Sequence, residues 1–256
     1  MMIETSEGTA VDVINCGNFL LDGGSMFGRV PKVMWEKWFP ADEKNRIIMA
    51  TNVLRIFKAD RVFLVDAGLG LCYDKKDLSI LGIDFEQPHP IKEPVSCLIC
   101  THLHFDHIGG IQDLEVQSEV FVSRIEWEDA HLDSPLTIGS YRKIDLDLIK
   151  EHLSIIDPPF SITDGIQILP TPGHTKGHVS VLIDDEIFYA GDLIPTSAHV
   201  HLPCIMAYDL NPLEIIETKH RILTEAHNRR WKVIYEHDPY RPVSSIGIRN
   251  NKFIVL

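Results

Sequence analysis

Three histidines and an aspartate follow one apolar run of the chain within six positions. The run Val95–Thr101 has the composition of a buried strand, and His102, His104, Asp106 and His107 come directly after it. A turn at the end of a strand can direct all four side chains into one cleft. Because buried imidazoles repel one another when protonated, a divalent cation that coordinates neutral imidazole and carboxylate would stabilise the cluster. The sequence therefore predicts a metal site at this turn.

Three later segments repeat the order of a strand followed by a candidate ligand. The first is a Gly/Pro turn at residues 170–178, and the other two follow short apolar runs. They supply two histidines and a carboxylate: His174, Asp192 and His237. A structural zinc site usually closes with cysteine ligands, which are not interleaved with these residues. The pattern thus favours a catalytic metal site.

Short runs rich in Val, Ile, Phe and Leu, bounded by Gly, Asp or Pro, predict strands throughout the chain. They are Val11–Asn15, Thr51–Phe57, Arg61–Asp66, Val95–Thr101, Glu119–Ser123, Ile166–Leu169, Val179–Ile183, Ile187–Ala190 and Trp231–Tyr235. The segment Ser245–Leu256 reads as a hairpin that turns near Asn250-Asn251. No repeat or flexible linker divides the chain. We expect one α/β domain over residues 1–256 with two packed sheets.

The clearest helix signal begins at Asn211-Pro212, where Asn suits the N-cap and Pro the first helical position. The predicted helix runs to about Arg229, with one apolar face. That face is formed by Leu213, Ile216, Leu223 and Ala226. Shorter helices are predicted at Ile108–Leu114, Arg124–His131 and Ile144–His152.

Charge and composition exclude several classes of partner. The net charge is −13, whereas phosphate recognition needs a cationic surface, so we expect no nucleic-acid partner. No apolar run approaches the roughly 18 residues that cross a bilayer, and no secretory signal pattern is present, so we expect no membrane association. An odd number of cysteines indicates free thiols and a cytoplasmic location. These are Cys16, Cys72, Cys97, Cys100 and Cys204.

The C-x-x-C formed by Cys97 and Cys100 lies inside the predicted strand Val95–Thr101. A redox-active C-x-x-C needs a helix N-terminus to lower the pKa of a thiol, and a strand does not provide one. Both cysteines are therefore interpreted as small buried apolar residues.

H-x-H-x-D-H, the P-G-H-T-x-G-H turn, a later G-D and a late His, in this order, resemble the metallo-β-lactamase-like superfamily. The resemblance covers almost the whole chain. It implies a four-layer αββα sandwich with a two-metal site at its edge. His102, His104 and His174 would bind one ion, and Asp106, His107 and His237 the other. Asp192 would bridge both ions, and His178 would pack behind the site.

The same resemblance implies a hydrolase. Two divalent ions lower the pKa of a bridging water, so that hydroxide is available near neutral pH, and they polarise the substrate oxygen. Asp106, besides binding metal, could carry a proton to the leaving group. Zinc is the first choice of metal, and iron or manganese are alternatives because all three accept His and carboxylate ligands.

The segment Asp22–Arg46 is similar to the N-terminal loop of the branch that contains N-acyl-homoserine lactonases and organophosphate hydrolases. Its apolar side chains suit a wall over the metals, but they would equally pack a long loop onto the sandwich or form a homodimer interface. Two histidines after Asp192 would line the entrance. The candidate pocket residues are Met26, Phe27, Trp35, His199, His201 and Tyr208.

We expect a small-molecule ester-like substrate, with a lactone first and an organophosphate or thioester as alternatives. Lactonases of this branch commonly have a tyrosine three positions after the bridging aspartate, where this chain has Pro195; Tyr208 or Tyr240 would have to replace it. The alternative from another enzyme class is a mononuclear-iron sulfur dioxygenase. A non-catalytic scaffold would have lost a ligand, and all seven are present.

Overall fold

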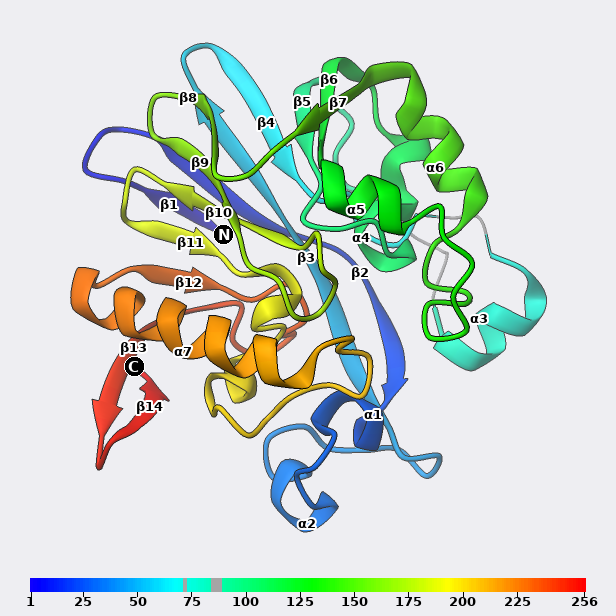
Figure 1. Cartoon of the computed structure of the whole chain (residues 1–256), viewed down its shortest axis with the longest axis vertical. Helices are drawn as coiled ribbons and strands as arrows, with labels where there is room; N and C mark the ends of the chain where they lie inside the picture. Colours follow the sequence, from blue (N-terminus) through cyan, green and yellow to red (C-terminus); the bar gives the residue numbers. More distant parts are fainter. Residues whose placement is uncertain (71–72, 84–88) are drawn as a thin grey trace.

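In a computed structural model that describes residues 1–70, 73–83 and 89–256, the chain forms two sheets of seven strands each. The first half of the chain forms one sheet, with strands in sequential order (Figure 1). These are β1 (Met2–Glu4), β2 (Ala10–Asp22), β3 (Arg46–Lys58), β4 (Arg61–Val65), β5 (Val95–Ile99), β6 (Val116–Ser123) and β7 (Leu153–Ile156). β1 to β4 pair antiparallel, and β4 to β7 pair parallel.

The second half forms the other sheet, also in sequential order. Its strands are β8 (Phe160–Thr163), β9 (Ile166–Pro170), β10 (Val179–Ile183), β11 (Ile187–Tyr189), β12 (Lys232–Ile234), β13 (Val243–Arg249) and β14 (Lys252–Val255). β11 and β12 pair parallel, and the other neighbours pair antiparallel. The predicted terminal hairpin is β13–β14, and Asn250 and Asn251 turn with φ of 50° and 55°.

Helices lie on the outer faces of the two sheets, which gives the four-layer αββα architecture that the family resemblance predicts (Figure 1). The described helices are α1 (Gly23–Phe27), α2 (Lys32–Trp35), α3 (Lys75–Leu81), α4 (Phe105–Ile108), α5 (Arg124–Asp129), α6 (Lys143–Ile149) and α7 (Pro212–Arg229). Of these, α4 to α7 pack on the outer faces, whereas α1 and α2 lie beyond the end of β2 in a separate apolar cluster. The 3₁₀ turns are η1 (Gly109–Asp113), η2 (Lys150–His152), η3 (Gly191–Leu193) and η4 (Ser197–Val200). Among the described residues, no helix is long and apolar enough to span a bilayer.

The main core lies between the two sheets. Side chains of β5 pack on both faces of the first sheet, toward this core and toward the outer helices. Cys97 and Ile99 pack in the core between the sheets, whereas Leu98 and Cys100 pack under α4 and α6 on the outer face. The alternation of a strand thus places the two cysteines on opposite faces, and both are buried and free. The C-x-x-C is structural. Cys72 lies outside the described residues.

Helix α7 begins as the sequence predicts, but its buried face is rotated. The side chain of Asn211 accepts a hydrogen bond from the backbone N–H of Glu214 and caps the helix. Leu213, predicted on the apolar face, is 75% exposed, and Ile216 is only partly buried. The residues that face the sheet are Ile215, Thr218, Lys219, Ile222, Leu223 and Ala226. Lys219 is a polar residue on this buried face and interrupts its apolar pattern. Burial of the lysine is possible because its ammonium group donates a hydrogen bond to the carbonyl of Cys204.

The parallel pairs determine where the functional residues gather. β4 and β5 run in the same direction, as do β11 and β12, so the loops that follow each pair emerge at one edge. These loops carry Asp66, the run 102–107, Asp192 and His237. The turn between β9 and β10 adds His174.

Candidate metal centre

The turn after β5 brings four predicted ligands to one side of the sheet edge. His102, His104, Asp106 and His107 are all buried. His104 is the N-cap of α4, so Asp106 and His107 lie on a helical turn instead of continuing the strand. The turn removes the alternation that would have separated these side chains onto opposite faces.

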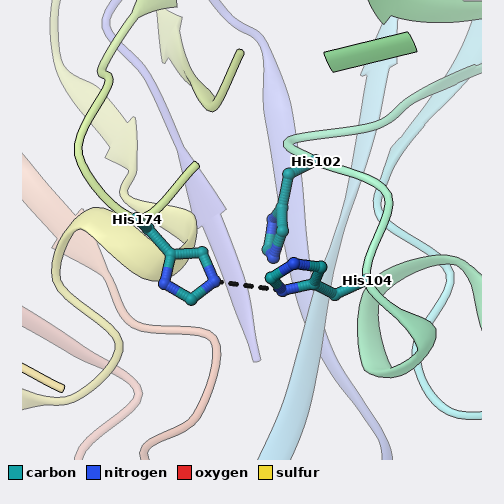
Figure 2. Close-up of side chains that lie close together, drawn as sticks. All are labelled: His102, His104 and His174. Atoms are coloured by element: carbon teal, nitrogen blue, oxygen red, sulfur yellow. Dashed lines mark hydrogen bonds between the residues drawn. The ribbon is translucent and has the colours of Figure 1, made fainter. Parts of the chain in front are cut away.

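His102, His104 and His174 form one group of facing imidazoles. Figure 2 shows the three rings pointing toward one another, with His174 reaching across from the second sheet. Nε2 of His174 lies 3.1 Å from Nδ1 of His104, and one nitrogen from each ring lies within 4.8 Å of the other two. The three residues are at least 92% buried, since His104, the most exposed, is 8% exposed.

Asp106, His107 and His237 form a second group beside the first. Nε2 of His107 lies 3.3 Å from Nε2 of His237, which lies 3.6 Å from a carboxylate oxygen of Asp106. Asp106 comes from α4, whereas His237 follows β12 in the second sheet. Both sheets therefore contribute to each group.

Asp192 lies between the two groups. Its Oδ2 is 3.2 Å from Nε2 of His174 and 3.7 Å from Nε2 of His107, and its Oδ1 is 3.1 Å from Nε2 of His237. Gly191 before it has φ of +52°, and a Cβ there would lie 2.8 Å from a nitrogen of His178. Only glycine allows the chain to turn this closely, so the G-D pair places the carboxylate between the groups.

The donor atoms fit divalent cations. Two ligands that each lie about 2.0–2.2 Å from one zinc ion are at most about 4.4 Å apart, and the 3.1–3.3 Å separations within the groups satisfy this limit. Among the described residues, Nε2 of His102 is a buried polar atom without a hydrogen-bond partner. Such atoms are destabilising unless another group binds them, so the cluster has the chemistry of a metal site.

The imidazoles of the cluster differ in their pKa values. Burial and the neighbouring imidazoles hold the pKa values of His102 and His104 well below their usual range, so both rings are neutral. Burial alone would also lower the pKa of His237, but the carboxylate of Asp192 beside it raises this pKa to about 9. A proton on His237 thus stands in for part of the positive charge that a cation would supply.

A layer of hydrogen-bond partners orients the imidazoles from behind. Nδ1 of His174 lies 3.0 Å from a carboxylate oxygen of Asp209, and Nδ1 of His237 lies 2.7 Å from the carbonyl of Ala50. Nδ1 of His107 lies 2.8 Å from Glu236 and 3.1 Å from Asp66. Such partners fix the tautomer, leaving Nε2 of each ring to face a metal.

Asp66, Asp209 and Glu236 are not among the site residues that the sequence predicts. Glu236 precedes the predicted ligand His237, and Asp66 ends a predicted strand as His102 follows one, so their positions held a weak signal. Asp209 lies 35 positions from His174 in a loop, and no local pattern indicates it.

His178 packs behind Asp192. Its Nε2 accepts the backbone N–H of Asp192 at 3.0 Å, and its Nδ1 lies 2.9 Å from the hydroxyl of Thr171. Burial lowers its pKa to about 3, so the ring stays neutral and keeps its acceptor. It supports the loop of Asp192 and does not join either group of facing ligand atoms.

A cavity of about 170 Å³ opens onto the cluster. Its floor includes His104, Asp106, His174, Asp192 and His237. Its walls are mostly apolar: Leu21, Met26, Leu81, Phe105, Leu136, Met206, Tyr208 and Leu210, with Thr137 and Ser140. No lysine or arginine lines the part of the cavity that the described residues form.

Met26 and Tyr208 line this cavity, but four other candidate pocket residues do not. Phe27 and Trp35 are fully buried, and their rings stack 5.6 Å apart, so this part of the 22–46 loop packs as core. His199 stacks on Phe27, and its ring nitrogens lie 2.7 Å from the hydroxyl of Thr196 and 2.9 Å from the carbonyl of Met26. His201 lies against Trp38 in a separate groove.

Comparisons with known proteins agree with this geometry. A family model described as the metallo-beta-lactamase superfamily matches residues 48–237. An N-acyl homoserine lactonase of Bacillus sp is 36% identical over 94 residues, which are 37% of this chain and 35% of that protein. The chain therefore matches about a third of that lactonase's length. A probable metallo-hydrolase of Mycobacterium tuberculosis is 25% identical over 239 residues, covering 75% of this chain and 76% of that one.

Solved structures share the fold over nearly the whole chain. The crystal structure of a probable metal-dependent hydrolase from Staphylococcus aureus has a TM-score of 0.87 and 25% identity, covering 97% of both chains. AidC, described as a dizinc quorum-quenching lactonase in complex with a product, has a TM-score of 0.78 and 19% identity, covering 100% of this chain and 96% of that one.

Proposed function

Since the chain belongs to the metallo-beta-lactamase superfamily, whose family model matches residues 48–237, we propose that it hydrolyses a small, uncharged, ester-like substrate with an apolar part. A lactone is the favoured substrate. We also propose that the reaction uses two metal ions.

The observation that carries the proposal is the cavity above the cluster. Its walls are apolar, and no lysine or arginine lines the part formed by the described residues. An apolar wall stabilises a hydrocarbon chain, and the few polar groups at the floor would orient the reacting carbonyl. A substrate with carboxylates or phosphates would find no cationic side chain on this wall, which disfavours a glutathione-type thioester.

The proposed metal assignment follows the two groups of facing side chains. His102, His104 and His174 would hold one ion, Asp106, His107 and His237 the other, and Asp192 would contact both. We propose zinc, because the structurally similar AidC is described as a dizinc enzyme. When bound, such ions lower the pKa of water and polarise a carbonyl oxygen.

Side chains of the cavity would transfer protons and orient the substrate. Asp106 lines the cavity with a carboxylate that can hold a proton and deliver it to the leaving oxygen. Burial raises the pKa of Tyr208, so its hydroxyl stays protonated and can donate to the substrate carbonyl from the cavity wall. Pro195, at the position where lactonases have a tyrosine, instead accepts a backbone hydrogen bond from His237.

The first test is ring opening of a lactone panel, followed by proton release with metal-reconstituted protein. N-acyl lactones with an apolar acyl chain should turn over, and a succinyl analogue that ends in a carboxylate should be a much poorer substrate than its butyryl counterpart. Asp106→Asn should lower kcat by about 10²-fold or more, in the range of general acid–base catalysis. The metal content of each preparation is measured in parallel.

Tyr208→Phe and Tyr240→Phe form the matched pair for this test, because Tyr208 lines the cavity and Tyr240 is 58% exposed outside it. Only Tyr208→Phe should lower kcat/KM. A protein that holds two metals but opens no lactone would refute the substrate proposal and direct the work to phosphotriesters and thioesters. One iron per chain would refute the two-metal proposal and favour the sulfur dioxygenase.

A further inference from the structure

Glu126 is a buried carboxylate whose role the proposed reaction does not explain. It lies in the first turn of α5 and is 1% exposed. Its Oε1 accepts the backbone N–H of Leu103 and the hydroxyl of Tyr141, both at 3.0 Å, and its Oε2 accepts the hydroxyl of Thr175 at 2.5 Å. Three donors from three separate loops therefore converge on one carboxylate.

Two of these donors adjoin proposed ligands of a single metal. Leu103 stands between His102 and His104, and Thr175 follows His174. The third donor, Tyr141, also packs near this group, because its ring centroid lies 5.0 Å from that of His104. Glu126 thus connects the loop of the first sheet to the turn of the second sheet at the place where the three imidazoles of Figure 2 face one another.

The backbone of the His174 turn lies very close to the backbone of α5. A Cβ at Gly177 would lie 2.1 Å from the backbone nitrogen of Glu126, so the turn that carries His174 approaches α5 as closely as glycine allows. Movement of Glu126 would therefore be transmitted to this turn. The other group is oriented by different residues, since His107 contacts Asp66 and Glu236, and His237 contacts Ala50.

We propose that Glu126 is a positioning residue that sets the separation of the 102–104 loop and the His174 turn, and so the metal affinity of this group alone. The inference rests on the proposed two-metal function. Glu126 affects metal affinity mainly through its hydrogen bonds to three donors and less through its negative charge. A carboxylate suits the position because it only accepts, whereas an amide would present a donor to one of the three.

The test is a metal titration of the wild type and of Glu126→Ala, Glu126→Asp and Glu126→Gln, with zinc in competition with a chromophoric chelator. Removing a residue that orients ligands weakens metal binding by about 10–100-fold, so Glu126→Ala should weaken one site by this factor and leave the other unchanged. Glu126→Asp keeps the charge but not the reach and should resemble Ala. Glu126→Gln keeps an oxygen for Leu103 and Tyr141 and should show a smaller loss.

Glu128→Gln is the matched control, because it removes the charge of an exposed carboxylate on the same helix. It should bind both zinc ions like the wild type. Thr175→Val removes one donor while keeping the shape of the side chain, and it should also weaken only one site. This variant keeps the test decisive if Glu126→Ala does not fold. Turnover lost at limiting zinc should return at excess zinc.

Equal weakening of both sites, or unchanged affinity in Glu126→Asp and Thr175→Val, would overturn the inference. An Asp variant that binds like the wild type while Gln binds like Ala would show that charge, not reach, matters, and would also overturn it. These outcomes are distinct from failure of the proposed function, in which the wild type itself would not bind two metals.

Discussion

At the residue scale, the proposed ligands divide into imidazoles that are neutral and imidazoles that carry a proton when no metal is bound. Burial and like neighbours keep His102 and His104 neutral. His237 is different, because the nearby Asp192 outweighs burial and raises its pKa to about 9. Neighbouring carboxylates also outweigh burial at His107 and His174 and raise the pKa values of both, so protons and metal compete for imidazole nitrogens in each group.

Metal binding to the metal-free protein should therefore release protons at neutral pH. A metal binds only deprotonated imidazole, so below pH 9 it must displace the proton of His237, and affinity should rise as pH increases toward 9. Zinc titrations in weak buffer at pH 7 and 8.5 would measure both effects. His237→Ala should release about one proton fewer at pH 7, and His131→Gln, at an exposed histidine, should match the wild type. Affinity that does not change with pH would contradict the assignment.

The proposed ligands can be selected from the sequence, because four of the seven lie within six consecutive positions and the rest follow strand-like runs. The residues behind them cannot. Asp209 meets His174, and Glu126 meets Leu103, only through tertiary contacts over 35 and 23 positions. Phe27 and Trp35 are buried and do not line the cavity, and the sequence could not distinguish these roles because an aromatic cluster has the same composition in a core as in a binding wall.

At the scale of elements, the start of α7 is joined to the turn that carries His174. The backbone N–H of Asn211 donates to the carbonyl of Gly173 at 2.9 Å, and that of Leu210 donates to the carbonyl of His174 at 3.0 Å. The helix cap and the ligand turn therefore form one unit. The stability of the helix N-terminus contributes to the position of His174.

Asn211→Ala should lower the free energy of unfolding by about 1 kcal/mol, the usual effect of losing an N-cap acceptor. The variant removes the oxygen that accepts the N–H of Glu214. Asn211→Asp keeps an acceptor and should remain close to the wild type. Urea unfolding of the three metal-free proteins measures the difference. An alanine variant as stable as the wild type would show that the cap is not used.

Elements with strong local signals were predicted, and weak or short ones were not. The nine predicted strands and the helix from Asn211 all appear, with boundaries shifted by up to seven residues at the end of β2, because apolar runs and caps are local signals. β1, β7 and β8 are not predicted, because their few apolar residues lie beside Glu4, Ser154 and Ser161 and form no continuous apolar run. The prediction of the buried face of α7 is wrong in part, because a lysine lies on this face and hides its apolar pattern.

At the scale of the whole molecule, the candidate metal centre lies where the two halves of the chain meet. Loops of the first sheet supply His102, His104, Asp106 and His107, and those of the second supply the other three proposed ligands. The core between the sheets already holds them together. Bound metals would add a second connection at the sheet edge, where like groups would otherwise repel.

Chelation should consequently lower the Tm, and zinc should restore it. A ligand that binds only the folded state at 100 times its Kd stabilises by about 2.7 kcal/mol. Asp192→Ala, which removes the carboxylate between both groups, should show a smaller difference in Tm between zinc-loaded and chelated protein. Calorimetry of both proteins with zinc and with a chelator measures this. A Tm that does not respond to chelation would mean that the halves are not joined through metal.

The apolar wall of the cavity also bears on how a reaction cycle would end. A lactone enters without charge, but its hydrolysis product carries a carboxylate. The described wall has no lysine or arginine to retain this anion, and the chain as a whole carries a net charge of −13. The wall that admits the reactant would therefore disfavour the product. An enzyme built in this way should release its product readily and resist product inhibition, because only the metals themselves can hold the new anion.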